Sequence, residues 1–192
     1  MRQATWAAET ARQLLETQLP IRWAHSSCAA AQARSLAPIL GPDADLIESA
    51  AWLHDIGYSA DVTGTGFHPL DGARYLRDVA GADAAVCRLV AHHSCARIEA
   101  RHRGIAEELM TEFPRPRHDL ERALIYCDMT GGPKGAVITV DDRLADIFRR
   151  YEPGSPVGLT MGEAAPVLTD SVRVIQARLA LLKSGLAVPA RC

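Results

Sequence analysis

The chain has 192 residues, of which 48 % are hydrophobic and 23 % are charged, and its formal net charge is -2. This length allows one domain with a substantial core, and the composition is that of an ordinary globular protein. The small negative charge excludes a basic field for a nucleic-acid polymer and a polybasic footprint for a membrane surface. No apolar run approaches the roughly 20 residues that are needed to span a bilayer.

The N-terminus and the cysteines indicate the cellular compartment of the protein. The first eleven residues are polar and amphipathic and include Glu9, which is not typical of a signal peptide. The five cysteines have no paired spacing and leave an odd number. Because disulfide frameworks and thiolate zinc sites need paired cysteines, we expect reduced thiols in a cytoplasmic protein. The low aromatic content of 5 %, with abundant Ala and Leu, favours helices over strands.

Hydrophobic periodicity predicts helices from the N-terminus onward. Residues 4–19 form the first helix, which Pro20 closes, and residues 21–36 form the second. His25 lies on the inner face of the second helix. A lone histidine on such a face is more often a core residue with its hydrogen bonds satisfied than a metal ligand. His25 therefore indicates a metal site only together with other ligand-type residues.

The third predicted helix, capped by Asp43 or Asp45, ends in an apolar stretch followed by His54 and Asp55. His54 continues the inward stripe of that helix. Burying an imidazole beside a carboxylate is costly unless something compensates the charge, and a bound cation is the simplest compensation. We expect Gly57 to adopt the left-handed conformation that ends the helix.

Three more histidines follow on the next two predicted helices. Pro69 suits the first position of a helix and places His68 at its N-cap, where His68 either caps the helix or presents a ligand. The next helix, capped by Asp83, carries His93 at the end of its inward stripe, whereas His92 lies about 100° round the helix. If only one of this pair binds a metal, we expect it to be His93.

Residues 96–113 predict one charged, solvated helix, and the helix after it carries Asp128 at the end of a buried stripe. The Gly-rich turn over residues 129–135 has two interpretations. It presents backbone N–H groups and Lys134 to a phosphate, or it simply ends the helix. The turn lacks the spacing of a P-loop.

Two helices complete the predicted chain, and the first of them is expected to bury Phe148. Thr160 and Glu163 match a capping box before the long terminal helix. The inner stripe of that helix is predicted to comprise Leu168, Val172, Ile175, Leu179 and Leu182. We therefore expect one all-α domain over residues 1–185, followed by a flexible tail over residues 186–192.

Metal-type ligands thus recur on faces that are otherwise apolar. Four predicted helices deliver His25, His54 with Asp55, His93 and Asp128, and His68 lies at the start of a fifth. Imidazoles and carboxylates without thiolates suit Fe, Mn, Zn, Ni, Co or Mg rather than a closed structural zinc site. The set is large enough for two ions bridged by Asp55, and two ions about 3.5–4 Å apart activate water and neutralise phosphoryl charge.

This ordered set resembles the HD superfamily of metal-dependent phosphohydrolases. The positions that carry the resemblance are His25, His54, Asp55 and Asp128. Three segments, namely residues 54–57, residues 68–73 and the pair His92-His93, further resemble the HDIG-type branch that has extra histidines for a second ion. The resemblance spans about residues 20–130 and implies an all-α, single-domain HD-type helical bundle.

The resemblance also implies roles for individual residues. The first divalent metal would be held by His25, His54, Asp55 and Asp128. The second would be held by His68, His92 and His93, with Asp55 shared as the catalytic bridging residue. Water activated by the metal would attack phosphorus. Charge and placement make Arg22, Lys134 and Arg143 candidates to bind the substrate phosphate.

Two departures from the family pattern narrow the range of possible substrates. Tyr58 follows Ile56-Gly57 where many relatives carry Lys, so one usual cation beside the phosphate is missing. Nothing after His93 resembles the Gly-Tyr-Pro segment of cyclic-di-GMP phosphodiesterases, which argues against that substrate.

We therefore expect a phosphohydrolase that acts on a phosphate ester or anhydride of a small metabolite or nucleotide. Two alternatives remain open. One is an HD-type mixed-valent di-iron oxygenase that cleaves C–C or C–P bonds, and the other is a non-catalytic HD module that binds a nucleotide. The expected partner is a small phosphorylated molecule, and the sequence leaves the oligomeric state open, with a homodimer compatible.

Overall fold

The computed structural model describes residues 2–185, and within that range it contains helices and no β-strand. The prediction of an all-α fold is therefore confirmed. In chain order the elements are α1 (Gln3–Leu15), α2 (Pro20–Ser35), α3 (Ala37–Leu40), η1 (Gly41–Asp43), α4 (Ala44–Leu53), η2 (Ile56–Tyr58), α5 (His68–Asp78), α6 (Ala84–His92), η3 (His93–Cys95), α7 (Ala96–His102), α8 (Ala106–Glu112), α9 (His118–Thr130), α10 (Val140–Arg150) and α11 (Pro156–Lys183).

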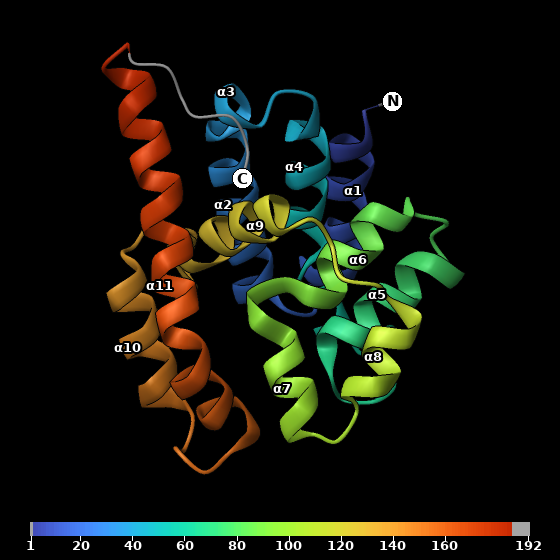
Figure 1. The fold of residues 1–192 in the computed structure, drawn as a ribbon. Coiled ribbons are helices and arrows are strands. Elements are labelled where there is room, and N and C mark those ends of the chain that lie inside the picture. Colours follow the sequence, from blue (N-terminus) through green and yellow to red (C-terminus); the bar gives the residue numbers. More distant parts are fainter. Residues whose placement is uncertain (1, 186–192) are drawn as a thin grey trace.

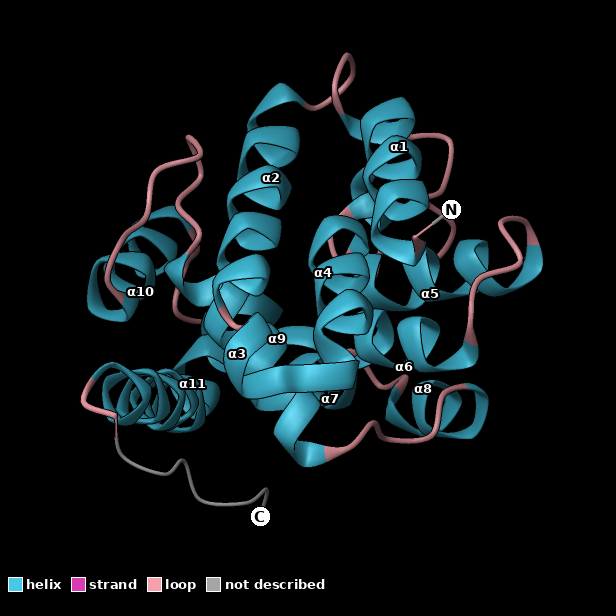
Figure 2. Ribbon diagram, turned by 90° about the horizontal axis from the view of Figure 1, so that it is seen from above, coloured by secondary structure: helices cyan, strands magenta, loops and turns pink. Residues whose placement is uncertain are grey.

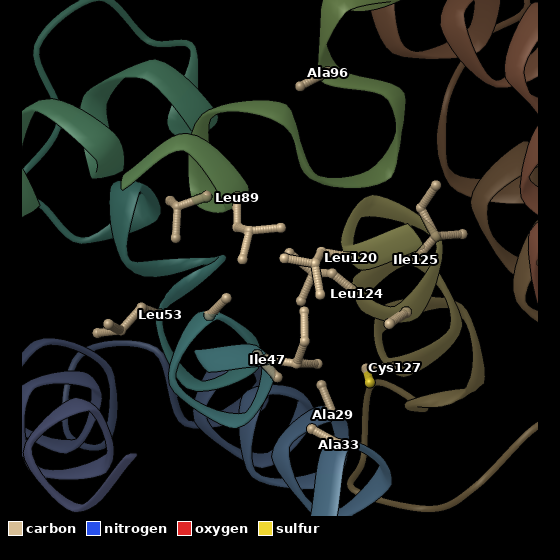
Figure 3. Close-up of a cluster of buried hydrophobic side chains, with 14 of the residues drawn as sticks. Ala29, Ala33, Ile47, Leu53, Leu89, Ala96, Leu120, Leu124, Ile125 and Cys127 are labelled. Atoms are coloured by element: carbon tan, nitrogen blue, oxygen red, sulfur yellow. The ribbon is translucent and has the colours of Figure 1, made fainter. Parts of the chain in front are cut away.

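Three helices, α2, α4 and α9, pack on one another at the centre of the bundle. The helices α10 and α11 lie together on one side of this centre, and α5, α6 and α8 lie on the opposite side (Figures 1 and 2). Small side chains let the central helices approach closely, because Ala29 and Ala33 of α2 are fully buried. They lie with Ile47 of α4 and Leu124 of α9 in the same hydrophobic cluster (Figure 3).

The helix ends agree with the sequence prediction at one of three positions. The Asp83 side chain accepts a hydrogen bond from the Ala85 N–H at 2.7 Å, so the predicted cap of α6 is confirmed. The prediction that His68 is an N-cap is wrong, because His68 is the first residue of α5 and Phe67 precedes it. Gly57 has no positive φ, which corrects the expected left-handed helix end.

The C-terminal half differs most from the sequence prediction. Residues 96–113 form two helices, because Gly104 takes a φ of +74° between them. The last helix begins at Pro156, capped by the Ser155 hydroxyl, rather than after a capping box at Thr160. Phe148 was expected to be inward but is 46 % exposed.

The predicted inner stripe of α11 is correct only in part. Leu168, Val172 and Ile175 are buried, whereas Leu182 is 37 % exposed. The predicted tail over residues 186–192 lies outside the described residues. Across residues 2–185, none of the helices combines the length and the apolar character that a membrane crossing requires.

Candidate metal centre

The first group of ligand-type side chains joins three central helices. His25 comes from α2, His54 follows the last residue of α4, and Asp128 lies on α9. The Nε2 atoms of His25 and His54 are 3.2 Å apart, and Oδ1 of Asp128 lies 2.9 Å from Nε2 of His25. All three side chains are buried and converge on one point.

The second group lies beside the first. Nε2 of His68, at the start of α5, is 3.1 Å from Nε2 of His93, which directly follows α6. Oδ1 of Asp55 lies 3.7 Å from Nε2 of His68. These atoms are close enough to share one ion.

Asp55 connects the two groups through its two oxygens. While Oδ1 faces His68, Oδ2 lies 3.6 Å from Nε2 of His54 and 3.9 Å from Nε2 of His25. One carboxylate therefore presents an oxygen to each group, which is the arrangement that a ligand shared by two ions requires.

Backbone carbonyls orient two of the imidazoles. Nδ1–H of His54 donates to the Ala51 carbonyl at 2.8 Å, and Nδ1–H of His93 donates to the Val90 carbonyl at 2.6 Å. Both histidines stand where a helix has just ended, so these carbonyls in the last turn are free to accept. The bonds place the proton on Nδ1 and leave the lone pair of Nε2 directed at the centre, as a metal ligand requires.

The protonation states also suit metal binding. Burial lowers the pKa of His68 and of His93, and neighbouring imidazoles lower these pKa values further. Burial raises the pKa of the Asp55 and Asp128 carboxyls, but Arg22, Arg143 and the surrounding imidazoles outweigh it and hold both pKa values well below their ordinary range. Neutral imidazoles and ionised carboxylates are the forms that bind metals.

The separations fit ions between the side chains. Two ligands at right angles, each about 2.1 Å from an ion, are about 3.0 Å apart. The Nε2 pairs at 3.1 and 3.2 Å match that spacing. Two lone pairs directed at each other at this distance repel unless a proton or cation lies between them. The donor set therefore fits a divalent ion in each group.

Two arginines border the centre. Nη1 of Arg22 is 2.9 Å from Oδ2 of Asp55, and Nη2 of Arg143 is 3.4 Å from Oδ1 of Asp128. The Arg22 guanidinium lies 3.8 Å over the Tyr58 ring, which stacks on His68 with a centroid distance of 3.9 Å. These side chains line a pocket of about 90 Å³. Its apolar lining includes Ile147 from α10 and Val157 and Met161 from α11.

A comparison with protein-family models shows to which family this chain belongs. A family model described as the HD domain matches residues 22–152, more than half of the chain. The chain belongs to the HD-domain family. Searches of curated proteins and of solved structures returned no match. Most proteins of the HD superfamily are metal-dependent hydrolases.

The adjacent residues His54 and Asp55 take different places in this HD domain, because His54 belongs to the first group whereas Asp55 has an oxygen toward each group. Six of the seven predicted ligands come together at the centre: His25, His54, Asp55, His68, His93 and Asp128. Arg22 and Arg143, predicted from charge and placement, line the pocket beside them.

Two predicted site residues are not brought to the HD centre. His92 is buried elsewhere, and its Nε2–H donates to the Phe113 carbonyl at 2.6 Å, so its assignment as a ligand is corrected. Lys134 is exposed and does not line the pocket. In its turn the Gly132 N–H donates to the Ala136 carbonyl at 2.7 Å, so that group is not presented to a phosphate. In this structure the turn follows the end of α9, and it does not bring Lys134 to the pocket.

One polar residue of the centre was missed by the sequence analysis. The Ser94 hydroxyl donates to Oδ2 of Asp128, and Ser94 lines the pocket. Its position directly after His93 was the only available signal, and sequence spacing does not reveal where a hydroxyl points.

Proposed function

We propose that this HD protein is a metal-dependent phosphohydrolase that acts on a phosphate ester or anhydride of a small metabolite or nucleotide. The observation that carries the proposal is the Asp55 carboxylate, which has one oxygen facing each ligand group. The two guanidinium groups of Arg22 and Arg143 beside the same pocket add support, because planar guanidinium groups bind phosphate through two parallel hydrogen bonds.

The cofactor would be one or two divalent ions drawn from Fe, Mn, Zn, Ni, Co and Mg. His25, His54 and Asp128 would hold one ion, and His68 and His93 would hold the other, with Asp55 shared. When bound, two such ions supply an activated water and neutralise charge on a phosphoryl group.

The residues of the chain have separate tasks in this proposal. Arg22 and Arg143 orient the phosphoryl group at the open side of the ligand groups. The buried hydrogen bonds from Nδ1 of His54 and of His93 to backbone carbonyls hold these rings with Nε2 directed at the centre. The apolar lining from α10 and α11 excludes bulk water from the pocket, which strengthens the charge interactions inside it.

The experiment that tests the proposal combines metal analysis with hydrolysis. The protein is purified without chelator, its metal content is measured, and phosphate release is followed over nucleotides, sugar phosphates and p-nitrophenyl phosphate. We expect metal-dependent release by the native protein and none by Asp55→Asn. The matched control is His118→Ala, because His118 is exposed at the start of α9.

Two outcomes would redirect the proposal. Iron with a mixed-valent EPR signal and no phosphate release would favour the oxygenase alternative, because imidazole-rich sites also suit redox iron. Thermal stabilisation by nucleotides that persists in Asp55→Asn, without turnover in either protein, would favour a binding module.

A further inference from the structure

The backbone between α6 and α7 is strained at two consecutive residues. Ser94 has a φ of +46° and Cys95 a φ of +63°, and they are the only residues other than glycine with positive φ in residues 2–185. Neither is Gly, Asn or Asp, the types that adopt this conformation most readily. Such strain persists only where the surrounding structure holds it, and it concentrates at functional sites.

The strained turn delivers two side chains to one place. In a continuous helix, adjacent residues point about 100° apart. Here the chain leaves the helical path at His93, and both His93 and Ser94 line the same pocket. His93 belongs to the second ligand group, whereas Ser94 reaches across to Asp128 of the first.

The two oxygens of the Asp128 carboxylate have different partners. Oδ2 accepts the Ser94 hydrogen bond, and Oδ1 lies 2.9 Å from Nε2 of His25. A carboxylate rotates easily about its last bond, because that torsion has a broad energy profile. A hydrogen bond to the outer oxygen restricts this rotation and leaves Oδ1 as a single-oxygen ligand.

We propose that Ser94 is a positioning residue whose hydroxyl sets the orientation of the Asp128 carboxylate, and that the left-handed turn exists to deliver this hydroxyl. The inference rests on the metal centre proposed above. It goes beyond the ligands themselves, because it assigns a role to a residue that acts through Asp128 rather than as a ligand of the metal. Residues that orient metal ligands typically contribute 10- to 100-fold to metal affinity.

Three variants separate the hydroxyl from the backbone. Ser94→Gly removes the hydroxyl and relieves the strain, Ser94→Ala removes the hydroxyl and keeps the strain, and Ser94→Thr keeps the hydroxyl with a β-branched side chain that tolerates positive φ poorly. The Kd for Mn²⁺ is measured by calorimetry on chelator-treated protein. The Tm is measured on the same metal-free samples.

We expect the Tm and the affinity for Mn²⁺ to change independently of each other across the three variants. Ser94→Gly and Ser94→Ala both bind Mn²⁺ about 10- to 100-fold more weakly, although Ser94→Gly has the higher Tm of the two. Ser94→Thr has the lowest Tm and retains the native Kd within about threefold. The matched control is Ser26→Ala, because the Ser26 hydroxyl is buried next to His25 without a hydrogen-bond partner among residues 2–185. This control retains the native Kd.

The outcomes distinguish this inference from the proposed centre. If Ser94→Gly binds Mn²⁺ as tightly as the native protein, the hydroxyl does not position Asp128, and only this inference is overturned. If the native protein itself does not bind Mn²⁺ or another divalent ion, the metal centre is overturned, and the role of Ser94 with it.

Discussion

The guanidinium of Arg22 lies 2.9 Å from Oδ2 of Asp55, the same oxygen that faces His54 and His25. Asp55 is almost fully buried, and burial by itself raises the pKa of a carboxyl group. The charge of Arg22, followed by the nearby imidazoles, outweighs burial and holds the pKa of Asp55 well below its ordinary value. Arg22 therefore maintains the ionised carboxylate on which both ligand groups depend.

The first prediction concerns acid stability. A carboxyl with a depressed pKa in the folded state stabilises the fold above its unfolded pKa of about 3.9, and this contribution is lost as the pH falls through the folded value. Without Arg22 the folded pKa of Asp55 rises. We therefore expect Arg22→Ala to move the acid unfolding midpoint of the metal-free protein to higher pH, as measured by circular dichroism.

A surface arginine provides the control for this prediction. Arg34 pairs with Glu48 at 3.0 Å, but its side chain is 49 % exposed, so solvent screens the pair. Arg34→Ala should leave the acid midpoint nearly unchanged. Equal shifts in both variants would mean that Arg22 acts only through general surface charge.

The second prediction concerns the number of ions. Because Asp55 has an oxygen toward each group and His93 belongs to one group, their removal should have different consequences. We expect His93→Ala to retain about one ion of the two proposed and Asp55→Ala to retain none, measured as metal per chain after purification without chelator. Equal metal loss in both variants would contradict the division into two groups.

The third prediction follows from the corrected position of His92. Its ring fills buried space and its Nε2–H donates to the Phe113 carbonyl, so His92→Ala leaves a cavity and an unpaired carbonyl. We expect a loss of about 2–4 kcal/mol in the free energy of unfolding. Metal content should not change. If His92→Ala instead loses one ion per chain and keeps the native stability, His92 is a metal ligand after all.

Periodicity predicted the inward placement of the central histidines correctly. His25, His54 and His93 each extend an apolar stripe, and all three are buried. Asp128 follows a buried stripe in the same way, and His68 was placed at the start of a helix. The family resemblance then grouped these residues into one centre, although the sequence offered no measure of distance. The HD match over residues 22–152 agrees with that resemblance.

The features that were missed depend on contacts between distant segments. His92 finds its partner at Phe113, 21 positions further along the chain, and local spacing carries no signal for that bond. The left-handed turn at Ser94 and Cys95 runs against local propensity, so only the packing of the neighbouring helices can hold it. Lys134 has the right charge, but the turn that carries it leaves it in solvent.

The fourth prediction tests which cation binds phosphate. Arg143 is buried beside Asp128 at the pocket, whereas Lys134 is exposed and away from it. Arg143→Lys keeps the charge but loses the planar fork. We expect the Ki of inorganic phosphate to rise about 10-fold in Arg143→Lys, as the loss of one charge-assisted hydrogen bond implies. Lys134→Ala should retain the native Ki. If Lys134→Ala instead raises the Ki and Arg143→Lys does not, Lys134 is the cation that binds phosphate.

The last prediction concerns the close contact that brings Asp55 to His68. A Cβ added to Gly57 would lie 2.0 Å from the His68 carbonyl oxygen and 2.9 Å from the Gly72 nitrogen. Both are backbone atoms, so α5 must move away from the segment that follows Asp55. We expect Gly57→Ala to lower the free energy of unfolding by about 3 kcal/mol or more and to weaken the second ligand group.

The matched control for Gly57 is Gly64, which has no positive φ and whose added Cβ would approach only the Asp71 side chain, at 3.5 Å. Gly64→Ala should therefore be neutral or stabilising by up to about 1 kcal/mol, because it reduces the freedom of the unfolded chain. Urea unfolding gives the stabilities, and Mn²⁺ titration gives the affinities. A native-like Gly57→Ala variant would mean that α5 can shift without disturbing His68, and the spacing between Asp55 and His68 would then not depend on this glycine.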